Sequence, residues 1–215
     1  MNEKINCGSE ELIPKSEWVT PQDLEGELKV LNSPLMEKAF QKILTKFTPT
    51  HSIAFLSLCT ATRPYSKSRK WNVYNNYFGD KCDLIVTSNG GVIPQPFWEC
   101  YPYMTYDAYS HEDNGLYNKV LLRRLVEFFT KFDSYDTIIF NFRPGLRNRT
   151  VAEDFEKLDI AKKFNIIITP SEDAYGTDKK LGFPNGSMFP DLNHYSFEDI
   201  KKSVGVVEYS KSDLW

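Results

Sequence analysis

The stretch SIAFLSLCTATRPYSKSR, residues 52–69, decides how this chain is expected to fold. Its first part, residues 52–58, is a short and largely apolar run, which is typical of a strand that is covered on both faces. Its second part, residues 59–69, is small, polar and basic. In an open α/β sheet, ligands bind outside the carboxyl ends of the strands. A buried strand that is followed directly by hydroxyl-bearing and basic side chains therefore predicts an anion or nucleotide pocket at this point.

Three further runs resemble the strand expected at 52–58. Each is short, mostly β-branched and without clean alternation of apolar and polar residues, and they cover residues 82–87, 137–142 and 165–169. Strands that alternate with helices predict a parallel sheet with helices on both faces. We therefore expect an α/β fold, a three-layer sandwich around a central, mostly parallel, four-stranded sheet. The expected helices cover residues 34–47, 68–78, 116–132, 151–163 and 197–203.

The length of 215 residues allows one well-formed core. We expect an N-terminal arm at 1–32, an α/β domain that carries a nucleobase or nucleotide site at 33–176, and a C-terminal extension at 177–215 that packs on that domain. The formal net charge of −3 argues against binding nucleic acid mainly through bulk charge. It leaves room for a local basic site, because overall charge does not say where the cations cluster.

Composition also predicts the compartment and the absence of cofactors. No apolar stretch approaches the roughly 20 residues that are needed to cross a bilayer, and residues 1–7 lack the apolar region of a secretory signal. Widely separated cysteines and scattered histidines argue against a metal site. We expect a cytoplasmic protein with reduced thiols, no membrane partner, no metal and no cofactor. The residues concerned are Cys7, Cys59, Cys82, Cys100, His51, His194 and His111, the last of which is expected to face solvent.

Polar and basic residues follow each of the four expected strands. Because parallel strands present their carboxyl ends at one edge of a sheet, the four loops are expected to converge on a single site. After the first strand, arginines offer planar, bidentate contacts to phosphate, and hydroxyls add further donors. The other interpretation is a solvated loop that caps the next helix. The substrate-binding residues expected here are Thr62, Arg63, Tyr65, Ser66, Ser68, Arg69 and Cys59, the last of which could also be a nucleophile or a packing residue.

The loops after the second and third strands add a glycine turn and several arginines. The glycines allow a backbone to approach a ligand closely, although a simple tight turn would need the same residues. Their spacing is not that of a Walker loop or a dinucleotide fingerprint. The arginines could bind backbone phosphates, or alternatively they could cap a helix. The substrate-binding residues expected here are Ser88, Asn89, Gly90, Asn141, Arg143 and Arg147.

Residues 97–107, FWECYPYMTYD, are dense in aromatic side chains. Such rings can stack on a base while a carboxylate bonds to the edge of that base, or they can simply fill the core. We expect Tyr106 to contact a substrate. We expect Asp107 to be the catalytic carboxylate, because a charged group at the end of an aromatic run needs a partner.

Three segments together resemble one known family. Residues 58–68, LCTATRPYSKS, are similar to the "PCSARKPYSxSKS" pattern of a domain found in archaeosine synthase, an archaeal relative of tRNA-guanine transglycosylase. Residues 86–94, VTSNGGVIP, resemble its "TSPLGVVPRELE" segment, and residues 99–107 match its "E-x-YP-x-x-x-YD" continuation. The resemblance covers about residues 35–170. Thr60 stands where the pattern has serine, and Asn89-Gly90 stands where it has Pro-Leu.

The resemblance implies a uracil-DNA-glycosylase-like α/β sandwich connected with 7-deazaguanine or other modified-base metabolism. It does not imply transglycosylase activity, because the barrel with its aspartate nucleophile and the RNA-binding module have no counterpart here. One interpretation is a stand-alone relative from a virus or mobile element that modifies its own nucleic acid. The chain is thus expected to modify a nucleobase in a nucleotide, DNA or RNA, for which Asp107 would stabilise an oxocarbenium-like centre. The alternatives are a binding module that recruits a separate modification enzyme, and an interaction protein whose polar loops only cap helices.

Overall fold

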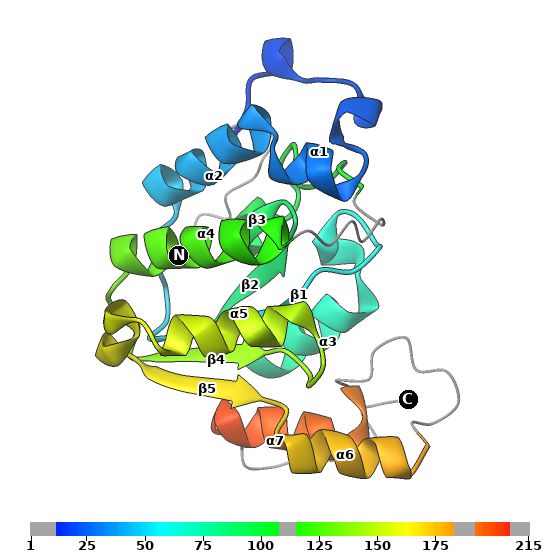
Figure 1. Ribbon diagram of the computed structural model, residues 1–215, viewed down its shortest axis with the longest axis vertical. Coiled ribbons are helices and arrows are strands. Elements are labelled where there is room, and N and C mark those ends of the chain that lie inside the picture. The colour runs from blue at the N-terminus through cyan, green and yellow to red at the C-terminus, as the bar shows by residue number, and fades with distance from the viewer. Residues whose placement is uncertain (1–11, 108–114, 183–191, 207–215) are drawn as a thin grey trace.

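The computed structural model describes residues 12–107, 115–182 and 192–206, and its centre is a five-stranded sheet in the order β3-β2-β1-β4-β5 (Figure 1). β1 pairs in parallel with β2 and β4, and β4 pairs in parallel with β5. The predicted α/β sandwich with a mostly parallel sheet is therefore confirmed. The strands are β1 (Ile53–Leu58), β2 (Asp83–Ser88), β3 (Gly91–Pro94), β4 (Thr137–Asn141) and β5 (Asn165–Thr169).

The prediction of four strands is wrong by one, because β3 was expected to be a loop. β3 runs antiparallel to β2, with Ser88 opposite Gly91 and Ile85 opposite Pro94. Gly91 has a φ of 129°, a backbone conformation that favours glycine and lets the chain reverse directly after β2. Pro94 is tolerated because β3 is an edge strand, where a missing N–H breaks no ladder. A four-residue strand that begins with glycine and ends with proline carries none of the usual strand signals.

Helices cover both faces of the sheet (Figure 1). On one face α4 packs against α5 through Phe129 and Phe155, whose ring centroids are 5.6 Å apart. On the other face α3 packs against α7 through Phe78 and Phe197, at 5.9 Å. None of the described helices is long and apolar enough to cross a bilayer. The helices are α1 (Glu27–Leu31), α2 (Pro34–Lys46), α3 (Arg69–Phe78), α4 (Leu116–Lys131), α5 (Arg147–Glu156), α6 (Glu172–Lys180) and α7 (His194–Ser203).

Most helix predictions are confirmed, and the differences have simple causes. The helix expected at 151–163 is two elements, α5 and a 3-10 helix at Asp159–Lys163. α5 begins four residues before the predicted start, which the sequence did not reveal because the first turn of the helix is polar. α1 and α6 were not predicted, since α1 is only five residues long and α6 is polar along most of its length. α6 also crosses the boundary that was expected at residue 176.

The order of the strands creates a switch point between β1 and β4. The chain leaves β1 through α3 to β2 on one side, then returns across β1 through α4 to reach β4 on the other. Ligands of open α/β sheets bind in the crevice at such a point. The side-chain amide of Asn141 at this point donates to Ser57 Oγ at 3.1 Å and to Tyr74 Oη at 2.6 Å. Asn141 was expected to bind substrate, but its side chain is 2% exposed and instead links β4 to β1 and α3.

Charged side chains join α2 to α4. The carboxylate of Glu37 on α2 accepts hydrogen bonds from both terminal nitrogens of Arg123, at 3.1 and 2.6 Å, and from Arg124 Nη2 at 3.2 Å. The pKa of Glu37 is lowered from its ordinary 4.5 to about 2. The hydrogen bond from Arg123 is the largest cause, partial burial opposes it, and Gln41 and the two arginine charges lower the pKa further.

We expect this contact to make stability depend on pH. Because the folded-state pKa of Glu37 is depressed, its contribution is complete above about pH 4.5 and is lost as the pH falls towards about 2. Since the side chain of Glu37 is 35% exposed, solvent screens part of this interaction, and the contribution after screening is about 1–2 kcal/mol. Urea titrations should show Glu37→Gln less stable than the parent by this amount at pH 7, with the difference vanishing near pH 2. A difference that is constant with pH would contradict the assignment.

Candidate functional site

The carboxyl edge of the sheet gathers residues from five segments far apart in the sequence. They are the loop after β1, the β2–β3 turn, the turn residues that lead to Asp107, the first turn of α4 and the start of α5. α1 from the N-terminal part lies over this edge, as its ion pair with α5 shows. We call this group the edge site. It consists of Glu27, Cys59, Arg63, Tyr65, Ser88, Asn89, Gly90, Tyr106, Tyr117, Arg147 and Asn148.

Arg63 lies against two tyrosines of the edge site. Its guanidinium carbon is 4.4 Å from the ring centre of Tyr65 and 4.6 Å from that of Tyr106, a cation–π arrangement with each ring. The two hydroxyls are 2.5 Å apart. Burial is the main cause that raises the pKa of both tyrosines. Burial also disfavours the charged form of Arg63, but the neighbouring Tyr106 and Tyr65 outweigh it and raise the pKa of Arg63, which stays a cation.

Cys59 provides a half-buried, free thiol at the end of β1. Its backbone N–H donates to Thr87 O at 3.0 Å, which continues the parallel ladder by one residue. After burial, the electrostatic effect of the neighbouring Cys59 is a further cause that raises the pKa of Tyr65, Tyr106 and Tyr117. The thiol therefore lies within electrostatic reach of all three hydroxyls.

The other described cysteines lie outside the edge site. Cys82 is free and 1% exposed, and burial raises its pKa to about 12. Cys100 is disulfide-bonded, which departs from the expectation that the thiols are reduced.

Arg124 of α4 holds the β2–β3 turn in place. Its side chain is 1% exposed, and Nη1 donates to Asn89 O at 3.4 Å and to Gly90 O at 3.1 Å. Ser88 Oγ accepts the N–H of Gly90 at 3.0 Å. A Cβ atom on Gly90 would lie 3.2 Å from the ring of Tyr106, closer than ordinary contact distance. The turn thus needs glycine because the ring packs directly on the backbone.

Arg147, the first residue of α5, lies on the opposite side of the turn. Its guanidinium is 3.7 Å from the ring centre of Tyr117, and its Nη2 donates to Asn89 Oδ1 at 3.3 Å. The same nitrogen forms an ion pair with Glu27, whose side chain is 1% exposed. Asn148 Nδ2 donates to the hydroxyl of Tyr117, and burial raises the pKa of that tyrosine. Two arginines, each with aromatic neighbours, therefore line the edge site.

Several predicted residues lie beside the edge site rather than within it. Thr62 and Arg69 are exposed, and Ser66 Oγ donates to Glu99 at 2.5 Å. Ser68 is fully buried at the start of α3, and its hydroxyl has no hydrogen-bond partner among the described residues. Arg143 donates to the hydroxyl of Tyr175 at 3.0 Å, which ties the loop after β4 to α6.

Asp107, the predicted catalytic residue, is exposed although it follows the buried Tyr106. Its backbone pairs with the N-terminal part of the chain: its N–H donates to Leu24 O at 3.0 Å, and its carbonyl accepts from Gly26 N at 2.8 Å. A carboxylate at the end of an aromatic run is expected to need a partner. That requirement applies to buried charges, and water satisfies this one.

Three residues of the edge site were not predicted from the sequence, Glu27, Tyr117 and Asn148, and neither was Arg124, which supports its turn. Arg124 could have been found, because it stands among Leu121, Leu125 and Phe128 on the apolar face of α4, where an arginine needs buried acceptors. Glu27 carried no such signal. His111, expected to face solvent, lies outside the described residues.

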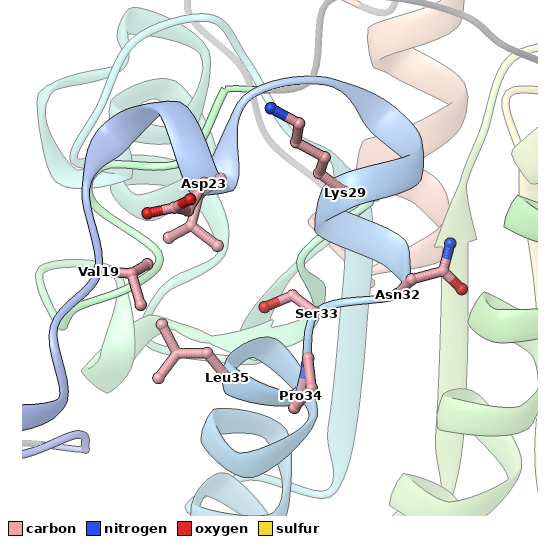
Figure 2. Close-up of a pocket in the computed structure, with 8 residues that line it drawn as sticks. Val19, Asp23, Lys29, Asn32, Ser33, Pro34 and Leu35 are labelled. Carbon is pink, nitrogen blue, oxygen red and sulfur yellow. The ribbon is translucent and has the colours of Figure 1, made fainter.

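The donor set of the edge site suits anions better than metals. Within residues 12–107, 115–182 and 192–206, no group of three or more His, Cys, Asp or Glu side chains could hold a metal ion. The two guanidiniums can bind phosphate or carboxylate oxygens, whereas the hydroxyls of Tyr65 and Tyr106 bond to each other and the N–H of Gly90 bonds to Ser88. An open pocket of about 560 Å³ lies elsewhere, between α1, the segment before it and the start of α2 (Figure 2).

Comparison with known proteins places the fold and the family. No curated protein matches the chain. A solved structure, that of AF0587, a protein of unknown function, is similar with a TM-score of 0.53 and 19% sequence identity, over 82% of this chain. The chain spans 52% of the length of AF0587, and at this identity the likeness shows the fold alone. Residues 36–182 match a family described as a domain of unknown function (DUF5591), and the chain belongs to that family.

Proposed function

We propose that the edge site binds the phosphate and base of a nucleotide unit, and that the chain modifies a nucleobase in a nucleotide, DNA or RNA. The observation that carries the proposal is the pairing of Arg63 and Arg147 with aromatic rings at the switch point of the sheet. Guanidiniums suit phosphate, and the tyrosines, whose rings are buried in this arrangement, would contact a base once the edge site opens. The segments that resemble the archaeosine synthase domain contribute residues to this same edge, which supports a role in 7-deazaguanine or other modified-base chemistry.

Two carboxylates are candidates for the chemical step. Asp107 is exposed beside Tyr106, so it can reach a substrate that lies over the edge site and stabilise an oxocarbenium-like centre. Glu27 is buried and bound to Arg147, so it must first leave that arginine before it can act on a substrate. We therefore keep Asp107 as the proposed catalytic residue.

The test is mass spectrometry of nucleosides from DNA and tRNA incubated with the protein, with and without free deazaguanine bases and nucleotides. We expect a new or missing base with the parent chain and none with Asp107→Asn, while circular dichroism shows an unchanged fold. Asp133→Asn is the matched control, because Asp133 is an exposed carboxylate that pairs with Lys163. Full activity of Asp107→Asn would remove this residue from the mechanism.

A second function, a binding module that recruits a separate modification enzyme, is favoured by the burial of the rings. Tyr65 and Tyr106 are 0% and 2% exposed, so neither ring presents a face to a base in this arrangement. This function predicts oligonucleotide binding that weakens steeply with salt, without any modified product. Arg63→Ala combined with Arg69→Ala should then abolish retention of the oligonucleotide. Unchanged retention would instead support an interaction protein whose polar loops only cap helices.

A further inference from the structure

The guanidinium of Arg147 has hydrogen-bonding capacity that the described residues do not use. Nη2 contacts Asn89 and Glu27, and the ring of Tyr117 lies below the guanidinium plane at 3.7 Å. Nη1 is buried and has no hydrogen-bond partner among the described residues. A buried N–H group without an acceptor is costly. At the ligand edge of a sheet, this unused donor points to an acceptor that a ligand supplies.

The carboxylate that neutralises Arg147 comes from a segment outside the family domain. Glu27 belongs to α1, whereas the family match begins at residue 36. The side chain of Glu27 is 1% exposed, a depth at which a carboxylate needs a cation. Residues 24–31, which we call the strap, thus bring a negative charge of the chain itself to an arginine that would otherwise face an anionic ligand.

Short contacts hold the strap in place. Its backbone is tied to Asp107 by the two hydrogen bonds at Leu24 and Gly26. The open pocket lies between part of the strap and the first turn of α2, and its lining includes Leu24 and Lys29 of the strap together with Ser33 and Leu35 (Figure 2). Leu24, Val30 and Leu31 of the strap are buried core residues, so a displacement of the strap by an anion is confined to the residues between Leu24 and Val30.

We infer that Glu27 is an intramolecular competitor of the ligand's phosphate for Arg147. A phosphate or pyrophosphate group takes the place of the carboxylate, fills the unused donor of Arg147 and releases the first turn of α1. The site is therefore closed by its own strap until an anion of sufficient charge arrives, which lowers its apparent affinity for that anion. This inference rests on the proposed function, because the anion is that of the nucleotide unit, and it adds the regulation of the same site.

Calorimetric titration with inorganic pyrophosphate tests the competition. Glu27→Gln should bind pyrophosphate about tenfold or more tightly than the parent chain, because the competing charge is gone. Glu25→Gln is the matched control: Glu25 is an exposed carboxylate two residues away, and its replacement changes the net charge equally. Adding Arg147→Gln to Glu27→Gln should abolish the gain. Equal affinities of the Glu27 and Glu25 variants would overturn the inference, as would a gain that persists without Arg147.

A second measurement on the parent chain covers the case in which Glu27→Gln fails to fold. Saturating pyrophosphate should speed hydrogen exchange in the peptide that contains residues 26–31, and should slow it near Arg147. Slower or unchanged exchange in the strap would overturn the inference. Pyrophosphate carries no base, so the outcome of the titration and of the exchange measurement does not depend on the outcome of the nucleoside experiment. A chain that modifies no base could still show the competition, and an active enzyme could lack it.

Discussion

Replacing Arg124 with methionine is expected to lower the free energy of unfolding by about 3 kcal/mol. Methionine keeps much of the apolar stem but removes the donors to Asn89 O and Gly90 O. Both residues of the turn are buried, so water does not replace the lost hydrogen bonds. Each buried carbonyl left without a donor costs roughly 1–3 kcal/mol. The loss of a buried charge partner of Glu37 adds to that cost.

The control is Arg123→Met, which removes the same charge one residue earlier in α4. Arg123 also contacts Glu37, but its side chain is 46% exposed and it supports no turn. We expect a cost of about 1 kcal/mol or less. Urea denaturation at pH 7 measures both variants under the same conditions. Equal effects would mean that the shared partner Glu37, and not the β2–β3 turn, accounts for the role of Arg124.

The central elements of the fold could be predicted because their signals are local. The runs that became β1, β2, β4 and β5 are apolar enough to be read as buried strands, and each was placed to within a residue or two. The start of α2 is equally clear: Ser33 Oγ accepts the N–H of Met36 at 3.3 Å, as a capping serine before Pro34 should. The alternation of these elements then implies the parallel sheet, and with it the edge at which the loops meet.

The composition of the edge site could be predicted only in part, because it depends on contacts between distant segments. Arg63, Tyr65, Asn89, Gly90, Tyr106 and Arg147 were predicted and lie together. The carboxylate of the site was assigned to Asp107 from its neighbours in sequence, yet Glu27, 120 positions before its partner Arg147, is the one that the fold buries there. Short polar segments such as α1 contain no periodicity that would reveal where they pack.

Asp83 provides the second large expected effect, at the end of the sheet opposite the edge site. Its carboxylate, on a residue 8% exposed at the start of β2, accepts hydrogen bonds from Thr50 N at 3.0 Å, Thr50 Oγ1 at 2.6 Å and the hydroxyl of Tyr135 at 2.9 Å. His51 Nδ1 is 2.9 Å from the same carboxylate. The group joins the segment before β1 to β2 and to Tyr135, two residues before β4.

Asp83→Ala is expected to cost about 3–5 kcal/mol, because it leaves several buried donors without an acceptor at once. Tyr135→Phe is the matched variant, since it removes one of these hydrogen bonds and leaves the carboxylate with its other partners; about 1–2 kcal/mol is expected. Thermal or urea unfolding at pH 7 compares the two. If Asp83→Ala were as mild as Tyr135→Phe, the carboxylate would not organise this end of the sheet.

A comparison of Asp83→Ala with Glu27→Gln separates stability from ligand binding. Asp83 lies at the amino end of β2, whereas Ser88 and the turn that it supports lie at the carboxyl end. Under conditions where Asp83→Ala remains folded, it should therefore bind pyrophosphate as the parent chain does, although it unfolds far more easily. The opposite pattern is expected for Glu27→Gln, whose affinity for pyrophosphate changes through Arg147. A loss of affinity in folded Asp83→Ala would mean that the edge site depends on the whole length of β2 and not on its own contacts.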